Sequence, residues 1–139
     1  MYNIDMENDI KQVIIVRKDL GMRKGKMIAQ GAHVSMKVFL NRIHSIDRID
    51  TKYWVMEILI DKNMKKWVEG LFTKIVVYVE SEKELLEYDV KAEFANIPHA
   101  LIKDSGLTEF KGVPTYTALA IGPDYNEKID KITGDLPLL

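Results

Sequence analysis

The sequence predicts a single α/β domain over residues 1–139, with helices on both faces of a small sheet of about four strands. Short apolar runs rich in β-branched residues alternate with stretches of helical periodicity, as in layered α/β proteins. The chain has 139 residues, 47% of them hydrophobic, which is enough for one core. It contains no repeat, linker or low-complexity segment.

Four segments are predicted to be strands. Residues 12–16 (QVIIV) and 74–79 (KIVVYV) are continuous apolar runs, typical of strands buried on both faces. Residues 100–102 and 116–121 form two shorter apolar segments between polar loops. These four segments are expected to pair in one sheet.

The helices are predicted from their start signals and from apolar periodicity. A long helix is expected over residues 23–43 and a shorter one over 64–72. Ser81-Glu82-Lys83-Glu84 has the form of a capping box and is expected to open a helix that ends near residue 95. The sequence Gly122-Pro123-Asp124 is expected to start a short C-terminal helix.

The segment between the first two helices is the hardest to assign. Its run YWVMEILI fits a helix or a strand equally well. We expect its large apolar residues to add to the core, with a dimer interface as the alternative. These residues are Tyr53, Trp54, Ile58 and Leu59.

The charge of the chain is unevenly distributed. The net charge is -1, but residues 11–42 hold eight Lys or Arg and a single acid, Asp19. Such local excess predicts a face that binds a polyanion. Basic residues on an ordinary solvated helix would give the same count, so the charge alone leaves both interpretations open.

Several classes of protein are excluded by missing signals. No apolar run approaches the roughly 18 residues of a membrane span, and the acidic start MYNIDMENDI does not resemble a secretory signal. The absence of cysteine excludes disulfides and thiolate metal sites and fits a cytoplasmic protein. Gly25-Lys26 is followed by Met27 rather than Ser or Thr, and neither G-x-G-x-x-G nor G-x-S-x-G occurs. The three histidines lack metal-ligand spacing, so we expect neither a metal nor a cofactor.

One candidate site lies along the first long helix. Lys26, Gln30 and His33 fall on one face, and Lys26 lies in the first helical turn, where the helix dipole favours anions. An ammonium, an amide and an imidazole could together hold a phosphate or a developing oxyanion. A solvated polar face would show the same spacing.

Other candidate residues follow predicted strands. Asp104 and Thr108 lie in the polar loop after residues 100–102, where a carboxylate and a hydroxyl could orient a water molecule. Asp104 could equally cap its own backbone in an Asx-type turn. Thr115 and Thr117 enter the last strand, although threonines are also simply good strand formers.

Four motifs resemble those of the type 2 peptidyl-tRNA hydrolases. VIIVRKDLGMRKGKMIAQGAH is similar to the family's strand followed by Arg-x-Asp-Leu and Gly-Lys-x-x-Ala-Gln-x-x-His. IKDSGLTEF, TYTALAIGP and KITGDLPLL resemble its Asp-Ala-Gly-x-Thr segment, its Thr-x-Thr-x-Leu-x-Ile-Gly-Pro strand and its Val-Thr-Gly-x-Leu ending. The four motifs occur in the family's order from residue 12 to the C-terminus.

The resemblance implies a three-layer α/β/α sandwich around a small mixed sheet, commonly dimeric. It implies hydrolysis of the ester between a peptide and the 3'-terminal ribose of tRNA, without metal or nucleotide cofactor. It also implies a catalytic set that joins the two candidate sites: Lys26, Gln30, His33, Asp104, Thr108, Thr115 and Thr117.

Roles for these residues follow as hypotheses. Lys26 would stabilise an oxyanion or hold a phosphate, Asp104 would orient water or a threonine hydroxyl, and His33 would relay a proton or support Lys26. The basic cluster would bind the tRNA backbone near its acceptor end through Arg17, Lys18, Arg23 and Lys24. The alternatives are a non-catalytic RNA- or protein-binding module on the same fold, and hydrolysis of a smaller ester or amide.

Overall fold

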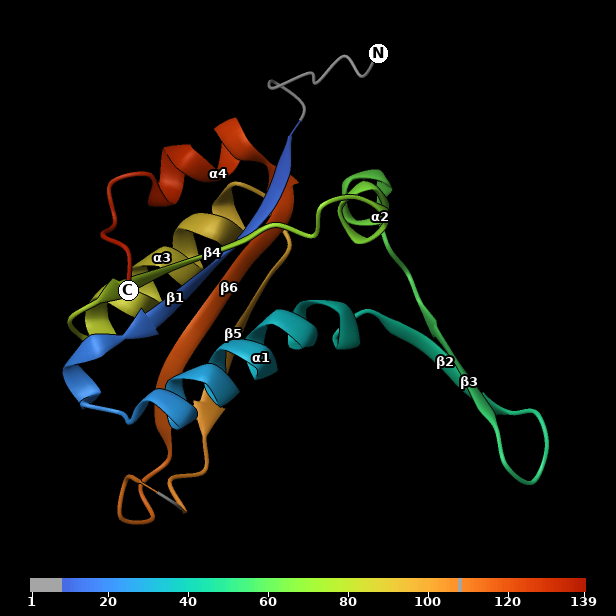
Figure 1. Cartoon of the computed structure of the whole chain (residues 1–139), viewed down its shortest axis with the longest axis horizontal. Helices are drawn as coiled ribbons and strands as arrows, with labels where there is room; N and C mark the ends of the chain where they lie inside the picture. Colours follow the sequence, from blue (N-terminus) through green and yellow to red (C-terminus); the bar gives the residue numbers. More distant parts are fainter. Residues whose placement is uncertain (1–8, 108) are drawn as a thin grey trace.

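A computed structural model describes residues 9–107 and 109–139 and shows a mixed sheet between two pairs of helices (Figure 1). The strands are β1 (Ile10–Arg17), β2 (Ile43–Arg48), β3 (Trp54–Ile58), β4 (Lys74–Val79), β5 (His99–Asp104) and β6 (Thr115–Tyr125). The helices are α1 (Lys24–Leu40), α2 (Lys62–Glu69), α3 (Glu82–Phe94) and α4 (Asn126–Thr133), with a 3-10 turn η2 (Lys18–Leu20).

Four strands form the main sheet in the order β4-β1-β6-β5. β1 runs parallel to β4 and antiparallel to β6, and β5 runs antiparallel to β6. The register pairs Ile14 with Val76 on one side and with Ala120 on the other. The predicted mixed sheet of about four strands is therefore confirmed.

The two faces of the sheet carry separate cores. α3 and α4 cover one face, where Leu85 and Ile129 pack against alternate residues of β1, β4 and β6. α1 and α2 lie on the other face, where Val34, Val38 and Met64 pack against the remaining set. This arrangement confirms the three-layer α/β/α sandwich.

Small side chains decide where α1 lies on its face. Ala100, Ala118 and Ala120, from β5 and β6, are all buried beneath it. Because these residues are small, the helix axis can approach β5 and β6 closely, and α1 contacts β6, β5 and β1 but makes little contact with β4. The helix therefore lies towards one edge of the sheet.

Most elements begin or end close to the predicted residues. Ser81 is the N-cap of α3, since its hydroxyl accepts a hydrogen bond from Glu84 N at 3.1 Å and the helix begins at Glu82. The strand predicted over residues 74–79 has those bounds. The first long helix ends at Leu40 rather than at residue 43, because Ile43 begins β2.

The predicted C-terminal helix starts too early. Gly122, Pro123 and Asp124 belong to β6, which continues to Tyr125 because Asp124 and Tyr125 pair with Lys11 and Ile10 of β1. Proline is tolerated here because the register shifts between Lys11 and Val13, which leaves a bulge opposite it. Long-range pairing thus overrides the local turn signal.

The expectation that residues of YWVMEILI add to the core is wrong. β2 and β3 form a two-stranded hairpin that reaches away from the body beyond the end of α1 (Figure 1). Tyr53, Trp54 and Leu59 are each more than half exposed, and Ile58 alone is partly buried. Apolar and polar side chains alternate along the run as in a strand. No other element of the described part of the chain covers the hairpin.

No helix in the described part of the chain combines the length and the apolar character needed to cross a membrane.

Two leucines give a direct test of this core. Leu85 is fully buried beneath α3, whereas Leu71 is 95% exposed. We expect Leu85→Ala to lower the free energy of unfolding by about 2–5 kcal/mol, because it removes buried apolar contacts and leaves a cavity. The matched Leu71→Ala variant should change it by less than about 0.5 kcal/mol in the same urea titration. Equal losses would contradict the assigned core.

Candidate active site

The candidate site forms where the first turns of α1 face the ends of β5 and β6. Lys26 lies on α1 and Asp104 at the end of β5, and their Nζ and Oδ1 atoms are 2.9 Å apart. Each side chain is only 14% exposed. The pair joins residues far apart in sequence, and its partial burial strengthens the attraction between the two charges.

Gln30 connects this ion pair to β6. It lies one turn after Lys26, is almost fully buried, and donates from Nε2 to Asp104 Oδ1 at 3.4 Å. Its Oε1 accepts a hydrogen bond from the hydroxyl of Thr117. Because a carboxylate only accepts hydrogen bonds, it fixes the orientation of the Gln30 amide, and this orientation makes Thr117 the donor.

The loop after β5 holds the carboxylate from the other side. Asp104 Oδ2 accepts a hydrogen bond from Gly106 N at 2.8 Å, which is the Asx-type turn that the sequence offered as an alternative. The turn and the ion pair coexist because they use different oxygens. Gly106 has φ +81°, and a Cβ there would collide with the backbone of Val113. Gly106 was not among the predicted site residues, although Asp-x-Gly is a recognisable turn signal.

These contacts determine the ionisation of Asp104. The hydrogen bond from Lys26 lowers the pKa of the Asp104 carboxyl below its ordinary value of 3.8, and this effect outweighs the opposing effect of burial. The hydrogen bonds from Gly106 and Gln30 lower the pKa further. Asp104 is therefore a carboxylate throughout the physiological range.

The remaining predicted catalytic residues lie at different places around this network. The Thr115 hydroxyl donates to Val113 O at 2.8 Å, at the entrance of β6. His33 is exposed on α1, about one turn beyond Gln30. Thr108 lies outside the described residues. The structure thus brings together Lys26, Gln30, Asp104 and Thr117.

The predicted tRNA-binding residues also differ from one another. The Arg17 side chain is 10% exposed, pairs with Asp19 at 2.6 Å and donates to Tyr116 O at 3.1 Å. Lys18 and Lys24 are exposed on either side of the turn before α1. Arg23 is exposed and pairs with Glu109 at 2.9 Å. Arg17 therefore ties η2 to the start of β6, while the other three present their charges outward.

Phe110 is a neighbour of the site that the sequence did not indicate. Its ring lies 5.8 Å from Lys26 Nζ, within the range of a cation–π contact. It also packs against the core under α1. An aromatic residue in a loop carries no spacing signal, so only the fold reveals this contact.

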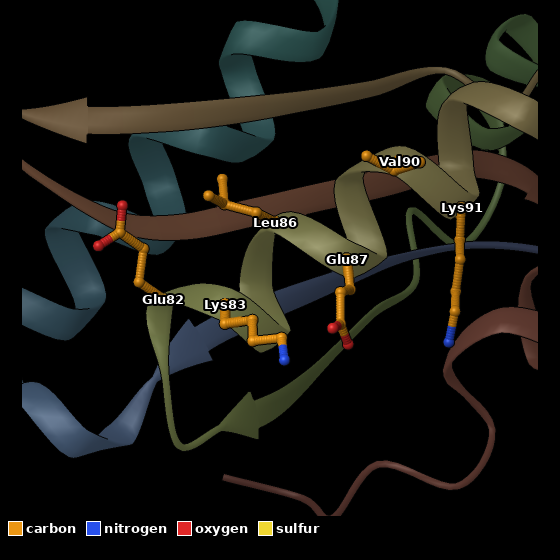
Figure 2. A pocket seen from close by; sticks show the side chains of 6 residues that line it. All are labelled: Glu82, Lys83, Leu86, Glu87, Val90 and Lys91. Atoms are coloured by element: carbon orange, nitrogen blue, oxygen red, sulfur yellow. The ribbon is translucent and has the colours of Figure 1, made fainter.

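Two other features of the described residues offer no site. A shallow hollow of about 730 Å³ lies along α3, and Figure 2 shows its lining side chains spreading from that single helix. They carry mixed charges and no converging polar groups, so the hollow offers no chemistry. Within residues 9–107 and 109–139, no three His, Asp or Glu side chains are grouped so that they could hold a metal ion.

Comparison with known proteins shows where this arrangement belongs. The family model described as peptidyl-tRNA hydrolase PTH2 matches residues 10–139. The chain belongs to this family. It is 41% identical over 130 residues to the peptidyl-tRNA hydrolase of Methanocaldococcus jannaschii, covering 94% of this chain and all of the relative.

Further PTH2 relatives agree over the same length. The peptidyl-tRNA hydrolase of Methanothermobacter thermautotrophicus is 42% identical over 130 residues, which cover 94% of this chain and all of the relative. That of Halobacterium salinarum is 40% identical, with coverage of 93% and 99%. The resemblance predicted from four motifs is therefore confirmed for almost the whole chain.

The ionisation of Asp104 gives a test of the network. We expect Lys26→Met to raise the pKa of Asp104, because the hydrogen bond from Lys26 is the largest cause of the lowered value. Carboxyl chemical shifts of labelled protein would measure the change, and Lys24→Met, on the exposed neighbour, should leave the pKa unchanged.

The same variant should change the dependence of stability on pH. A lowered pKa in the folded state stabilises the protein above the unfolded value and loses that effect as pH falls through the folded value. The stability difference between wild type and Lys26→Met should therefore shrink as pH falls below about 4. A difference independent of pH would contradict the assigned pairing.

Proposed function

We propose that this protein hydrolyses the ester bond between a peptide, or an N-blocked aminoacyl group, and the 3'-terminal ribose of tRNA. The observation that carries the proposal is the Lys26–Gln30–Asp104–Thr117 network in a chain of the PTH2 family. Relatives named peptidyl-tRNA hydrolase match this chain over nearly their full length. Released tRNA would return to translation.

The reaction needs stabilisation of negative charge on the carbonyl oxygen. Water adds to the ester carbon, the C=O electrons move onto oxygen, and the tetrahedral intermediate then expels the ribose oxygen, which takes up a proton. Lys26 is the cation nearest to this charge in our proposal, and the first turn of α1 adds the positive end of its dipole. Asp104 keeps the ammonium group in place.

Asp104 and the hydroxyl groups would position the attacking water. Because the pKa of Asp104 is lowered, it is a weak base and acts mainly by accepting a hydrogen bond from water. Thr117 holds Gln30 in the orientation that supports this carboxylate. We assign Thr115 to the substrate side of the network and His33 to proton relay at its exposed edge. Thr108, which lies outside the described residues, stays a predicted catalytic residue.

The basic residues around the start of α1 would bind the tRNA acceptor end. Lys18, Arg23 and Lys24 are exposed there, so they can contact phosphates without desolvation of a buried charge. Arg17 would act indirectly, because its guanidinium is engaged by Asp19 and Tyr116 O. This gives affinity without reading base sequence.

The proposal includes three further points. The reaction is metal-independent, because Lys26 supplies the positive charge. The protein acts in the cytoplasm, where translation occurs. Its assembly is a homodimer. The alternative of a non-catalytic binding module finds no support in the site. Such a module gains nothing from an ammonium, an amide and a carboxylate that converge in a partly buried cluster.

The catalytic proposal is tested with N-blocked aminoacyl-tRNA in EDTA. Lys26→Ala and Asp104→Asn should each lower kcat by about 10²–10³-fold, the usual loss when one group that stabilises an oxyanion is removed. The double variant should lose little more than either single one, because the two residues act as a unit. Lys37→Ala, further along α1, is the control and should be fully active. Activity that survives both substitutions would overturn the assigned site.

The tRNA-binding proposal predicts a strong salt dependence. The slope of log affinity against log salt should fall by about 1 for each phosphate contact removed, so Lys24→Ala should reduce it by about that amount. Lys128→Ala, on α4, should leave the slope unchanged. Affinity that does not depend on ionic strength would refute the proposed phosphate contacts.

A further inference from the structure

Strand β6 carries an extra residue where it passes the candidate active site. Its register against β5 pairs Ile102 with Ala118 but the next residue, Lys103, with Tyr116, so Thr117 has no partner of its own on β5. Two residues of one strand that oppose a single residue of its neighbour form a β-bulge. Bulges of this kind change the direction in which a side chain points.

The bulge turns the Thr117 side chain to the α1 face of the sheet. Alternate residues of a regular strand point to opposite faces, so Thr117 would share the face of Leu119, which packs under α3 and α4. Instead, Ala118 belongs to the core beneath α1, and Thr117 Oγ1 donates to Gln30 Oε1 from that same face. Tyr116, before the bulge, packs against the core under α3 and α4. The contact between Thr117 and Gln30 therefore depends on the bulge.

Arg17 contacts the backbone of β6 directly before the bulged residue. The register between β1 and β6 ends at the pair Val16–Ala118. From the next residue of β1, Arg17 Nη1 donates to Tyr116 O at 3.1 Å. This carbonyl belongs to the peptide group that joins Tyr116 to Thr117. A side chain thus continues the hydrogen bonding to β6 at the place where the strand pairing stops.

Asp19 fixes the direction of the Arg17 guanidinium. Arg17 Nε donates to Asp19 Oδ1 at 3.2 Å, and Nη2 donates to Oδ2 at 2.6 Å. Two parallel hydrogen bonds of this kind set the plane of the guanidinium and leave Nη1 facing Tyr116 O. The Arg17 side chain is buried, and a buried ion pair adds little stability because each charge loses its hydration. What the pair does supply is a fixed geometry.

We propose that Arg17 is a positioning residue of the active site, which holds the β6 bulge and so aims Thr117 at Gln30. The inference rests on the proposed function, since it assigns Arg17 to the same reaction. Arg17 fixes the bulge, and Thr117 then orients Gln30, which donates to the carboxylate of Asp104. A displacement of about 1 Å in such a network can lower a rate by about 10²-fold.

Direct contact with a tRNA phosphate is the competing role for Arg17. Such a contact would need the guanidinium to leave Asp19, which already neutralises its charge, and to move out of a buried position. The two roles leave different signatures. A phosphate contact contributes to affinity and to its salt dependence, whereas a positioning residue contributes to kcat.

Hydrolysis of N-blocked aminoacyl-tRNA by Arg17 variants distinguishes the two roles. We expect Arg17→Lys to lower kcat by about 10-fold to 100-fold, because an ammonium keeps the charge but not the planar fork that joins Asp19 to Tyr116 O. Arg17→Met should lose as much, while the salt dependence of tRNA binding stays that of wild type. A phosphate contact would instead leave kcat intact and reduce the salt slope by about 1 in Arg17→Met.

Arg42→Met is the matched control for these variants. It removes a guanidinium that also donates to a backbone carbonyl, Leu59 O, but at the other end of α1. Its kcat should equal that of wild type. Urea titration of each variant gives the folded fraction in the assay. An Arg17 variant with wild-type kcat per folded molecule would overturn the inference, because Arg17 would then serve stability alone.

Asp19→Asn is a milder variant that leaves Arg17 in the chain. We expect it to lower kcat several-fold and to shift the side-chain amide NMR signals of Gln30, as Arg17→Lys should also do. If Arg17 contacted tRNA, its release from Asp19 would strengthen binding and steepen the salt slope. That result, with unmoved Gln30 signals, would also overturn the inference.

The activity of wild type separates this inference from the proposed function. An active wild type whose Arg17 variants keep kcat overturns the role of Arg17 and leaves the function intact. A wild type that does not hydrolyse N-blocked aminoacyl-tRNA overturns the function. Gln30 signals that still shift in Arg17→Lys would then support the link from Arg17 to the network independently of the reaction.

Discussion

The close approach of α1 to β5 and β6 is the constraint on which the rest of the molecule depends. Three buried alanines, Ala100, Ala118 and Ala120, leave room for the helix on that side of the sheet. With larger residues there, Gln30 could not reach Thr117, and Lys26 could not reach Asp104. The same displacement leaves Val76 of β4 partly exposed on that face, while Ile14 and Val16 of β1 stay buried. The candidate active site and the partly exposed face of β4 are thus two results of one packing arrangement.

The network at the site has little freedom to rearrange. Asp104 accepts hydrogen bonds from Lys26, Gln30 and Gly106, which come from a helix and a loop on either side of it. Each donor points at a carboxylate that stays charged, so the amide and hydroxyl dipoles are oriented before any substrate arrives. Preorganisation of this kind avoids the energy of turning dipoles during the reaction. It also explains why a residue such as Gly106, which has no side chain, matters as much as its neighbours.

The sequence predicted the parts of the fold that local physics controls. Buried β-branched runs identified β1 and β4, and the capping box at Ser81 located the start of α3 within one residue. The candidate residues Lys26, Gln30, Asp104 and Thr117 were all named from the sequence, although only the fold shows that they touch. The extension of β6 through Pro123 was missed because its pairing partner lies more than 100 residues away. The β2–β3 hairpin was missed because its pattern fits a helix or a strand equally well, and its apolar side chains lie mostly exposed rather than in the core.

The β2–β3 hairpin returns to the point on the body from which it leaves. Leu59 N donates to Arg42 O at 3.1 Å, and Arg42 Nε donates to Leu59 O at 2.7 Å, so the chain is closed at the base of the hairpin. α1, with 17 residues, separates this base from Lys26 by roughly 20 Å at about 1.5 Å per residue. Loop-closure entropy grows only slowly with length, by about 0.6 kcal/mol per doubling. Residues 43–58 can therefore be shortened, lengthened or replaced as a unit. Such a change leaves the connection from α1 to α2 and the chemistry at the other end of α1 unaltered.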